Sequence, residues 1–124
     1  MGLEMTIDYL KAEYKRQTEI CAETDYADKK TIRKNNAAVD RMYAIIDSVS
    51  KSEEKDAITN FAQLLNEEEN RTHIWAAIQM LEKLKVDEIT KKVAIKIIET
   101  EAKSDSDSAV GLQYWLEKHQ KDSI

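Results

Sequence analysis

Proline is absent from this chain, and glycine occurs only at Gly2 and Gly111 among 124 residues. All-β folds need Gly and Pro in their tight turns, and nucleotide-binding α/β folds need glycine-rich loops. Apolar residues instead recur at helical spacing along almost the whole sequence. We therefore predict an all-α fold, and the length predicts one domain over residues 1–124.

Six amphipathic segments are predicted to be helices, beginning near residues 7, 29, 53, 71, 88 and 109. Thr6, Asn70 and Asp87 are candidate N-caps because their side-chain oxygens can accept hydrogen bonds from the first turn. Residues 50–53 have the Ser-x-x-Glu spacing of a capping box, which predicts the start of the third helix. The sequence SDSDS at residues 104–108 is predicted to be a solvated loop that caps the sixth helix.

The helical period also predicts which residues face the core. The predicted inward residues are Ile7, Leu10, Tyr14, Cys21, Ile32, Val39, Met42, Ile46, Val49, Ala57, Ile58, Phe61, Ala62, Leu65, Ile74, Ala77, Ile78, Leu81, Leu84, Ile89, Val93, Ile97, Ile98, Ala109, Leu112 and Leu116. Short connections between the helices predict antiparallel neighbours. Six such helices form either a closed bundle or an α-α superhelix of three stacked hairpins, and the similar lengths of the pairs favour the stack.

The segment NEEENRTHIWAAIQMLEKL, residues 66–84, resembles the second helix of a HEAT repeat. Such helices follow an acidic or Asn turn and carry a Val-Arg pair, two small residues and then spaced leucines. The turn here is residues 67–70 and the small pair is Ala76-Ala77, but Thr72-His73 stands at the Val-Arg positions. Because of this departure, the arginine's usual interhelical ion pair is not carried over to this chain.

Over residues 6–120 the chain is similar to small bacterial HEAT-like proteins of unknown function, sharing Asn35-Asn36 at the start of a long helix and Ala109 in the last. The resemblance implies a binding scaffold rather than an enzyme. A bacterial cytoplasm is the expected location, because residues 1–10 lack the basic and apolar regions of a signal peptide and no apolar run approaches the length of a membrane span. It further implies an immunity protein, similar to those that bind and neutralise a cognate toxin. A basic toxin, such as a nuclease, would suit a chain whose net charge is −5. No direct nucleic acid, membrane or cofactor is expected, and the free chain is expected to be a monomer or weak dimer.

Residue types that carry chemistry are sparse. His73 and His119 lack a Glu three residues earlier, so the Glu-x-x-His pattern of helical di-metal sites is not met. Cys21 is the only cysteine and has apolar neighbours, which favours a packed thiol over a nucleophile. The chain is therefore predicted not to be an enzyme, without catalytic, metal or cofactor-binding residues. Lys29, Lys30, Arg33 and Lys34 form a basic cluster for which a solvated face is the favoured interpretation.

A binding surface is predicted on the second helix of each hairpin, where polar and aromatic residues remain once the buried stripe is removed. Aromatic side chains among carboxylates are typical of protein-binding surfaces. The predicted protein-binding residues are Asn36, Asp40, Tyr43, Asp47, Trp75, Gln79, Glu82, Tyr114 and Trp115. Two other interpretations remain open: a structural or regulatory homo-oligomer, and a small helical enzyme or metal carrier.

Overall fold

A computed structural model describes residues 6–122, and within this range the chain is helical and has no strand. The elements are α1 (Ile7–Ala22), α2 (Lys29–Ser50), α3 (Ala57–Phe61), the 3-10 helices η1 (Ala62–Asn66) and η2 (Glu69–Arg71), α4 (Thr72–Lys83), α5 (Glu88–Ala102) and α6 (Ala109–Asp122). The predicted all-α class is thereby confirmed.

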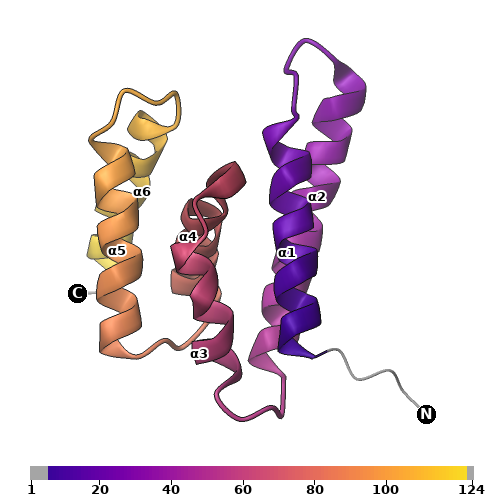
Figure 1. Cartoon of the computed structure of the whole chain (residues 1–124). Coiled ribbons are helices and arrows are strands. Elements are labelled where there is room, and N and C mark those ends of the chain that lie inside the picture. Colours follow the sequence, from indigo (N-terminus) through magenta and orange to yellow (C-terminus); the bar gives the residue numbers. More distant parts are fainter. Residues whose placement is uncertain (1–5, 123–124) are drawn as a thin grey trace.

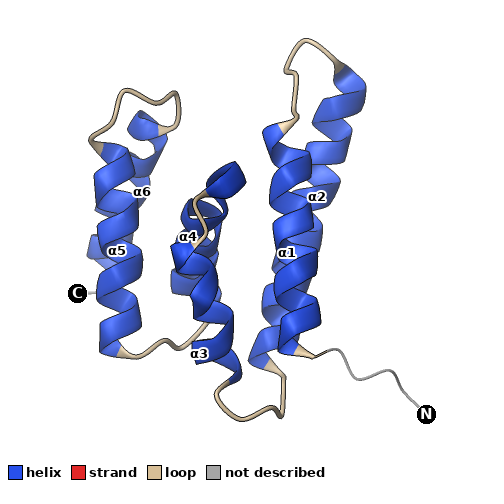
Figure 2. Ribbon diagram, in the orientation of Figure 1, coloured by secondary structure: helices blue, strands red, loops and turns tan. Residues whose placement is uncertain are grey.

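Three helical hairpins stand side by side, as Figure 1 shows. The first pairs α1 with α2, and the third pairs α5 with α6. In the second, η1, which directly continues α3, packs against α4. Helices α2, α4 and α6 all begin at the end of the molecule where the α1–α2 and α5–α6 loops lie (Figures 1 and 2). No loop separates α3 from η1 or η2 from α4. The HEAT-like superhelix stays a prediction.

A single apolar cluster runs through the hairpins, and it includes residues from all six α-helices. The rings of Tyr14 and Phe61 meet edge to face in this cluster, with centroids 5.3 Å apart. Ala76 and Ala77 are fully buried, which is consistent with the close helix packing expected of the small pair.

Two of the predicted N-caps are confirmed. The backbone N–H of Tyr9 donates to Oγ1 of Thr6, 3.1 Å away, at the start of α1. The N–H of Thr90 donates to Oδ1 of Asp87, 2.7 Å away, at the start of α5. These short polar side chains satisfy backbone donors that the first helical turn leaves unpaired.

The predicted capping box at residues 50–53 is wrong. Ser50 is still part of α2, and α3 begins only at Ala57, after Asp56 in a left-handed conformation with φ of 57°. The segment predicted as one helix from residue 53 is therefore a single α-helical turn followed by η1. The free carboxylate of Glu54 instead accepts a 2.7 Å hydrogen bond from the N–H of Ile7, so this loop caps α1.

The predicted N-cap at Asn70 is also wrong. Asn70 and Arg71 both have left-handed backbones, with φ of 55° and 60°, and α4 begins at Thr72 without a side-chain cap. Thr72 is buried, and its Oγ1 lies 2.7 Å from Oγ1 of Thr18 on α1. This buried pair fixes where α4 begins relative to the first hairpin.

The inward face of α5 is partly the predicted one. Ile98 is buried and Ile97 packs against the core, as predicted, but Ile89 and Val93 are exposed to 77% and 43%. Ala94 and Ala102 are buried instead. The two alanines let α5 lie close to both α4 and α6, the neighbours it contacts most. Close helix approach therefore outweighs the burial of the larger Ile and Val side chains, and both are left facing solvent.

Candidate functional site: a pocket between α2 and α4

The outward face of α2 carries four of the predicted surface residues. Asn36, Asp40 and Asp47 are exposed and Tyr43 is partly buried. Their spacing of four, three and four residues places them on one side of the helix. The same side faces α4, because Tyr43 reaches across to that helix.

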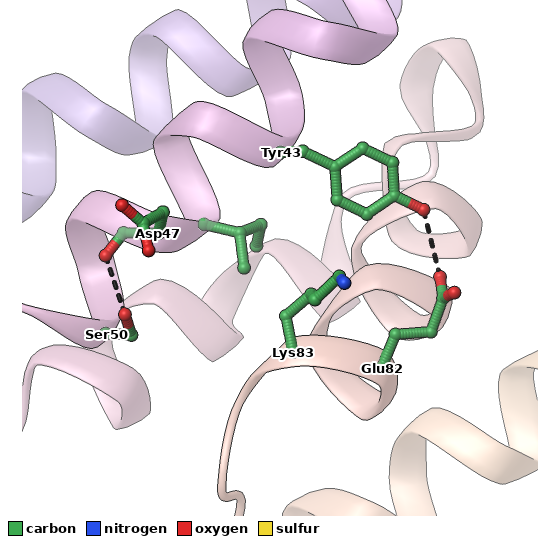
Figure 3. Close-up of a pocket in the computed structure, with 6 residues that line it drawn as sticks. Tyr43, Asp47, Ser50, Glu82 and Lys83 are labelled. Atoms are coloured by element: carbon green, nitrogen blue, oxygen red, sulfur yellow. Dashed lines mark hydrogen bonds between the residues drawn. The ribbon is translucent and has the colours of Figure 1, made fainter.

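Tyr43 and Glu82 join α2 to α4. The Tyr43 hydroxyl donates a 3.0 Å hydrogen bond to Oε1 of Glu82, and Figure 3 shows the two side chains meeting between the helices. The ammonium of Lys83 lies 5.8 Å from the centroid of the Tyr43 ring, within the range of a cation–π contact. These contacts hold the ring in a fixed position at the surface.

The environment of Tyr43 keeps its hydroxyl protonated. Burial, followed by the charge and hydrogen bond of Glu82, raises the pKa of Tyr43 to about 12. At neutral pH this group is therefore a hydrogen-bond donor and cannot act as a base.

A pocket of about 430 Å³ opens beside Tyr43. It is lined by Tyr43, Ile46, Asp47, Ser50, Glu82 and Lys83. The Ser50 hydroxyl donates to the backbone oxygen of Asp47 over 2.7 Å, and Lys51 pairs with the Asp47 carboxylate at 2.9 Å. The pocket thus combines the Tyr43 ring with two carboxylates and one ammonium, and its volume is enough to hold a single partner side chain.

Gln79 is not part of this surface, contrary to the prediction. Its side chain is 1% exposed, and its Oε1 accepts a 2.8 Å hydrogen bond from the hydroxyl of the buried Tyr14. The helical spacing correctly places Gln79 near Glu82 but cannot show that α1 covers it. The Gln79 amide is therefore part of the core and not of the predicted binding surface.

The remaining predicted residues lie away from the pocket. Trp75 is on α4 but lines a second cleft, near the start of the helix. Tyr114 is exposed on α6, while Trp115 packs against the core and stacks on the His119 ring with centroids 4.8 Å apart. Helix α6 packs mainly on α5, so the structure unites Tyr43, Asp47 and Glu82 but not the α6 aromatics.

Sequence reasoning missed Ser50 and Lys83 in the pocket and Arg71 near the second cleft. Arg71 lies between hairpins, with its Nη1 2.9 Å from a Glu101 carboxylate oxygen and its Nη2 donating to Ser108 Oγ over 2.6 Å. Hydrogen bonding from Ser106, followed by the contact with Arg71, lowers the pKa of Glu101. No local pattern in the sequence indicates this contact, because Arg71 and Ser108 lie far apart in the chain.

No group of three or more His, Cys, Asp or Glu side chains in the described part of the chain is arranged to hold a metal ion. Burial raises the pKa of the Cys21 thiol, which disfavours its thiolate. Across residues 6–122, none of the helices combines the length and apolar character that a membrane span requires.

Comparison with known proteins gives no class or family for this chain: no family model matches it, and no match was found among curated proteins or solved structures.

Proposed function

We propose that this chain is a non-enzymatic protein-binding domain, and more specifically an immunity protein that binds and neutralises a cognate bacterial toxin. The α2–α4 surface around Tyr43 would cover the toxin's active site or substrate groove. The observation that carries the proposal is the Tyr43–Glu82 hydrogen bond, because it brings predicted binding residues from two helices together at a surface pocket.

Charge supports a basic partner. Asp47 and Glu82 place two carboxylates at the pocket beside Tyr43, and the exposed Asp40 lies about one turn earlier on the same side of α2. The nearby cations are Lys51 and Lys83. The net charge of −5 adds a longer-range attraction for a cationic protein and speeds its association. Opposite charges at the rim would orient the partner rather than supply most of the affinity.

Tyr43 supplies the expected anchor. Tyrosine combines a large apolar ring with a polar tip, and it is among the residues that contribute most to protein interfaces. Its hydrogen bond to Glu82 and its contact with Lys83 already restrict its rotamer, so less conformational entropy is lost when a partner binds.

The test is affinity capture from the native cell with this chain as bait, read by mass spectrometry. We expect one stoichiometric partner that carries a toxin-like domain and whose capture is lost with Asp40→Lys. Glu99→Lys is the matched control, since it makes the same charge change at an exposed position of α5. A bait that recovers only itself, or equal loss with both variants, would contradict the proposal.

A second candidate function, a homo-oligomer, is favoured by a different observation. Four of the exposed large apolar residues lie on the last hairpin, Ile89 and Val93 on α5 and Val110 and Tyr114 on α6. Exposed apolar side chains of this kind are typical of contact surfaces. Light scattering separates the two functions: a stable dimer that Ile89→Lys converts to a monomer would favour the oligomer, whereas a monomer would count against it.

A further inference from the structure

A second cleft lies at the opposite end of α4 from the Tyr43 pocket. Its volume is about 700 Å³. It is lined by Cys21, Ala22, Thr24, Tyr26, Asn35, Asn70, Arg71, Trp75 and the loop residues Asp105, Ser106, Asp107 and Ser108. In Figure 1 the α1–α2 loop and the α5–α6 loop extend beyond the start of α4, so the first and third hairpins form the two walls.

The serines hold the 104–108 loop in shape. Ser104 Oγ donates to the Glu101 backbone oxygen over 2.6 Å, and it lies 2.9 Å from Ser106 Oγ, whose hydroxyl can donate to it. Ser106 Oγ and Ser108 Oγ lie 3.3 Å apart, and Ser108 also accepts from Arg71. The three serines thus connect the loop to itself and to the neighbouring hairpin.

The aspartates between these serines have no such role. Asp105 and Asp107 are exposed, and neither carboxylate has a hydrogen bond or ion pair with the described residues. Arg71, the cation lining the cleft, is already paired with Glu101. The cleft therefore retains two negative charges that nothing within the described chain neutralises.

Aromatic surface completes the cleft. Tyr26 is 80% exposed in the first wall, and the partly buried Trp75 contributes its indole from α4. Aromatic rings attract cations through their quadrupole, and carboxylates attract them directly. The two kinds of group favour the same type of occupant, a cationic side chain with an apolar stem.

We propose that this cleft binds a lysine- or arginine-bearing segment of a protein partner. The segment would lie across the start of α4, with its apolar stem on Tyr26 and Trp75 and its charged head at Asp105 and Asp107. This cleft is separate from the Tyr43 pocket, so the proposal does not depend on whether the α2–α4 surface binds a partner.

The test uses the capped peptide acetyl-Gly-Lys-Gly-Lys-Gly-amide as probe, with a glutamate peptide of the same length as its counterpart. Peptide is added to the full chain, and amide and indole signals are followed by NMR. We expect the lysine peptide to shift the Trp75 indole N–H and the amides of residues 105–108, and added salt to weaken binding. The bound peptide should also slow alkylation of Cys21, the only cysteine, which lines the same cleft.

Two double variants that each remove two negative charges test whether the peptide binds to this cleft or to the overall charge of the chain. Asp105→Asn/Asp107→Asn should weaken binding about fivefold. Glu99→Gln/Glu117→Gln removes two exposed carboxylates from α5 and α6 and should bind like the unaltered chain. Equal weakening by both pairs would mean attraction to overall charge and would overturn the proposal. An absence of shifts with the lysine peptide would also overturn the proposal. Stronger shifts with the glutamate peptide would overturn it too, and would assign the cleft to an anion held by Arg71.

Discussion

The Tyr14 hydroxyl on α1 donates a 2.8 Å hydrogen bond to Oε1 of Gln79 on α4, and both side chains are almost fully buried. The bond connects the first hairpin to the second through the core. Burial is the largest of the effects that raise the pKa of Tyr14 well above its usual value, so the hydroxyl remains a donor. The second hairpin is thus positioned by a polar contact as well as by apolar packing.

Loss of either partner of this bond should destabilise the fold. Tyr14→Phe leaves the buried Gln79 amide without its donor and should lower the free energy of unfolding by about 1–3 kcal/mol. Gln79→Met should also destabilise, since it leaves the Tyr14 hydroxyl unpaired. Urea unfolding followed by circular dichroism measures both changes. The double variant should cost less than the two single changes added together, and strict additivity would mean that the two groups do not interact.

Stability should fall at alkaline pH. The pKa of Tyr43 is about 12 in the folded protein, where burial and Glu82 raise it above the value of about 10 for an unfolded chain. Between these values the folded state keeps a proton that the unfolded state releases, so the stabilisation is complete below pH ~10 and is lost as the pH rises. Urea midpoints measured on both sides of this range should fall less in Tyr43→Phe. Tyr114→Phe, on the exposed α6 surface, is the control and should retain the unaltered fall.

Acid should weaken the contact between the second and third hairpins. Hydrogen bonds from Ser106 and Arg71 lower the pKa of Glu101, so its stabilisation is present above the unfolded value of about 4.3 and is lost as the pH falls through the folded value. The stability difference between the unaltered chain and Glu101→Gln should therefore shrink on acidification, as thermal unfolding would measure. A constant difference, or the same behaviour in Glu99→Gln, would contradict this role.

The left-handed backbone at Asp56 should favour glycine. Asp56 has φ of 57° and makes no side-chain cap for α3. Glycine adopts a positive φ without steric cost, which stabilises the folded state, but it also gives the unfolded chain more conformational freedom. We expect the first effect to be larger, so Asp56→Gly should raise the free energy of unfolding by about 0.5 kcal/mol. Asp56→Val should destabilise by about 1–2 kcal/mol. Lys55 lacks a positive φ, so Lys55→Gly should lower stability, and a rise there would contradict the explanation.

The features that depend on local sequence were predictable. The scarcity of Gly and Pro predicted the all-α class, and the side chains of Thr6 and Asp87 predicted two helix starts because capping involves only the adjacent turn. The i, i+3 and i+4 spacing also placed Asp40, Tyr43 and Asp47 on one exposed side of α2.

The features that depend on distant contacts were not predictable. Gln79 is buried because Tyr14, 65 residues earlier, supplies its hydrogen bond. Ile89 is exposed because the alanines of α5 allow its neighbours to pack closely on the other side. The helical period depends only on the hydrophobicity and position of each residue. It contains no information on which other helix will cover that residue.

The central claim is that the α2–α4 surface around Tyr43 binds a protein. Its most direct test is the affinity of the captured partner for Tyr43→Ala and Asp40→Lys, with urea unfolding of each variant beside it. We predict that both variants weaken the complex more than they weaken the fold, with Tyr43→Ala costing at least about 2 kcal/mol of binding energy. Variants that lose stability but bind with unchanged affinity would contradict the assignment of this surface.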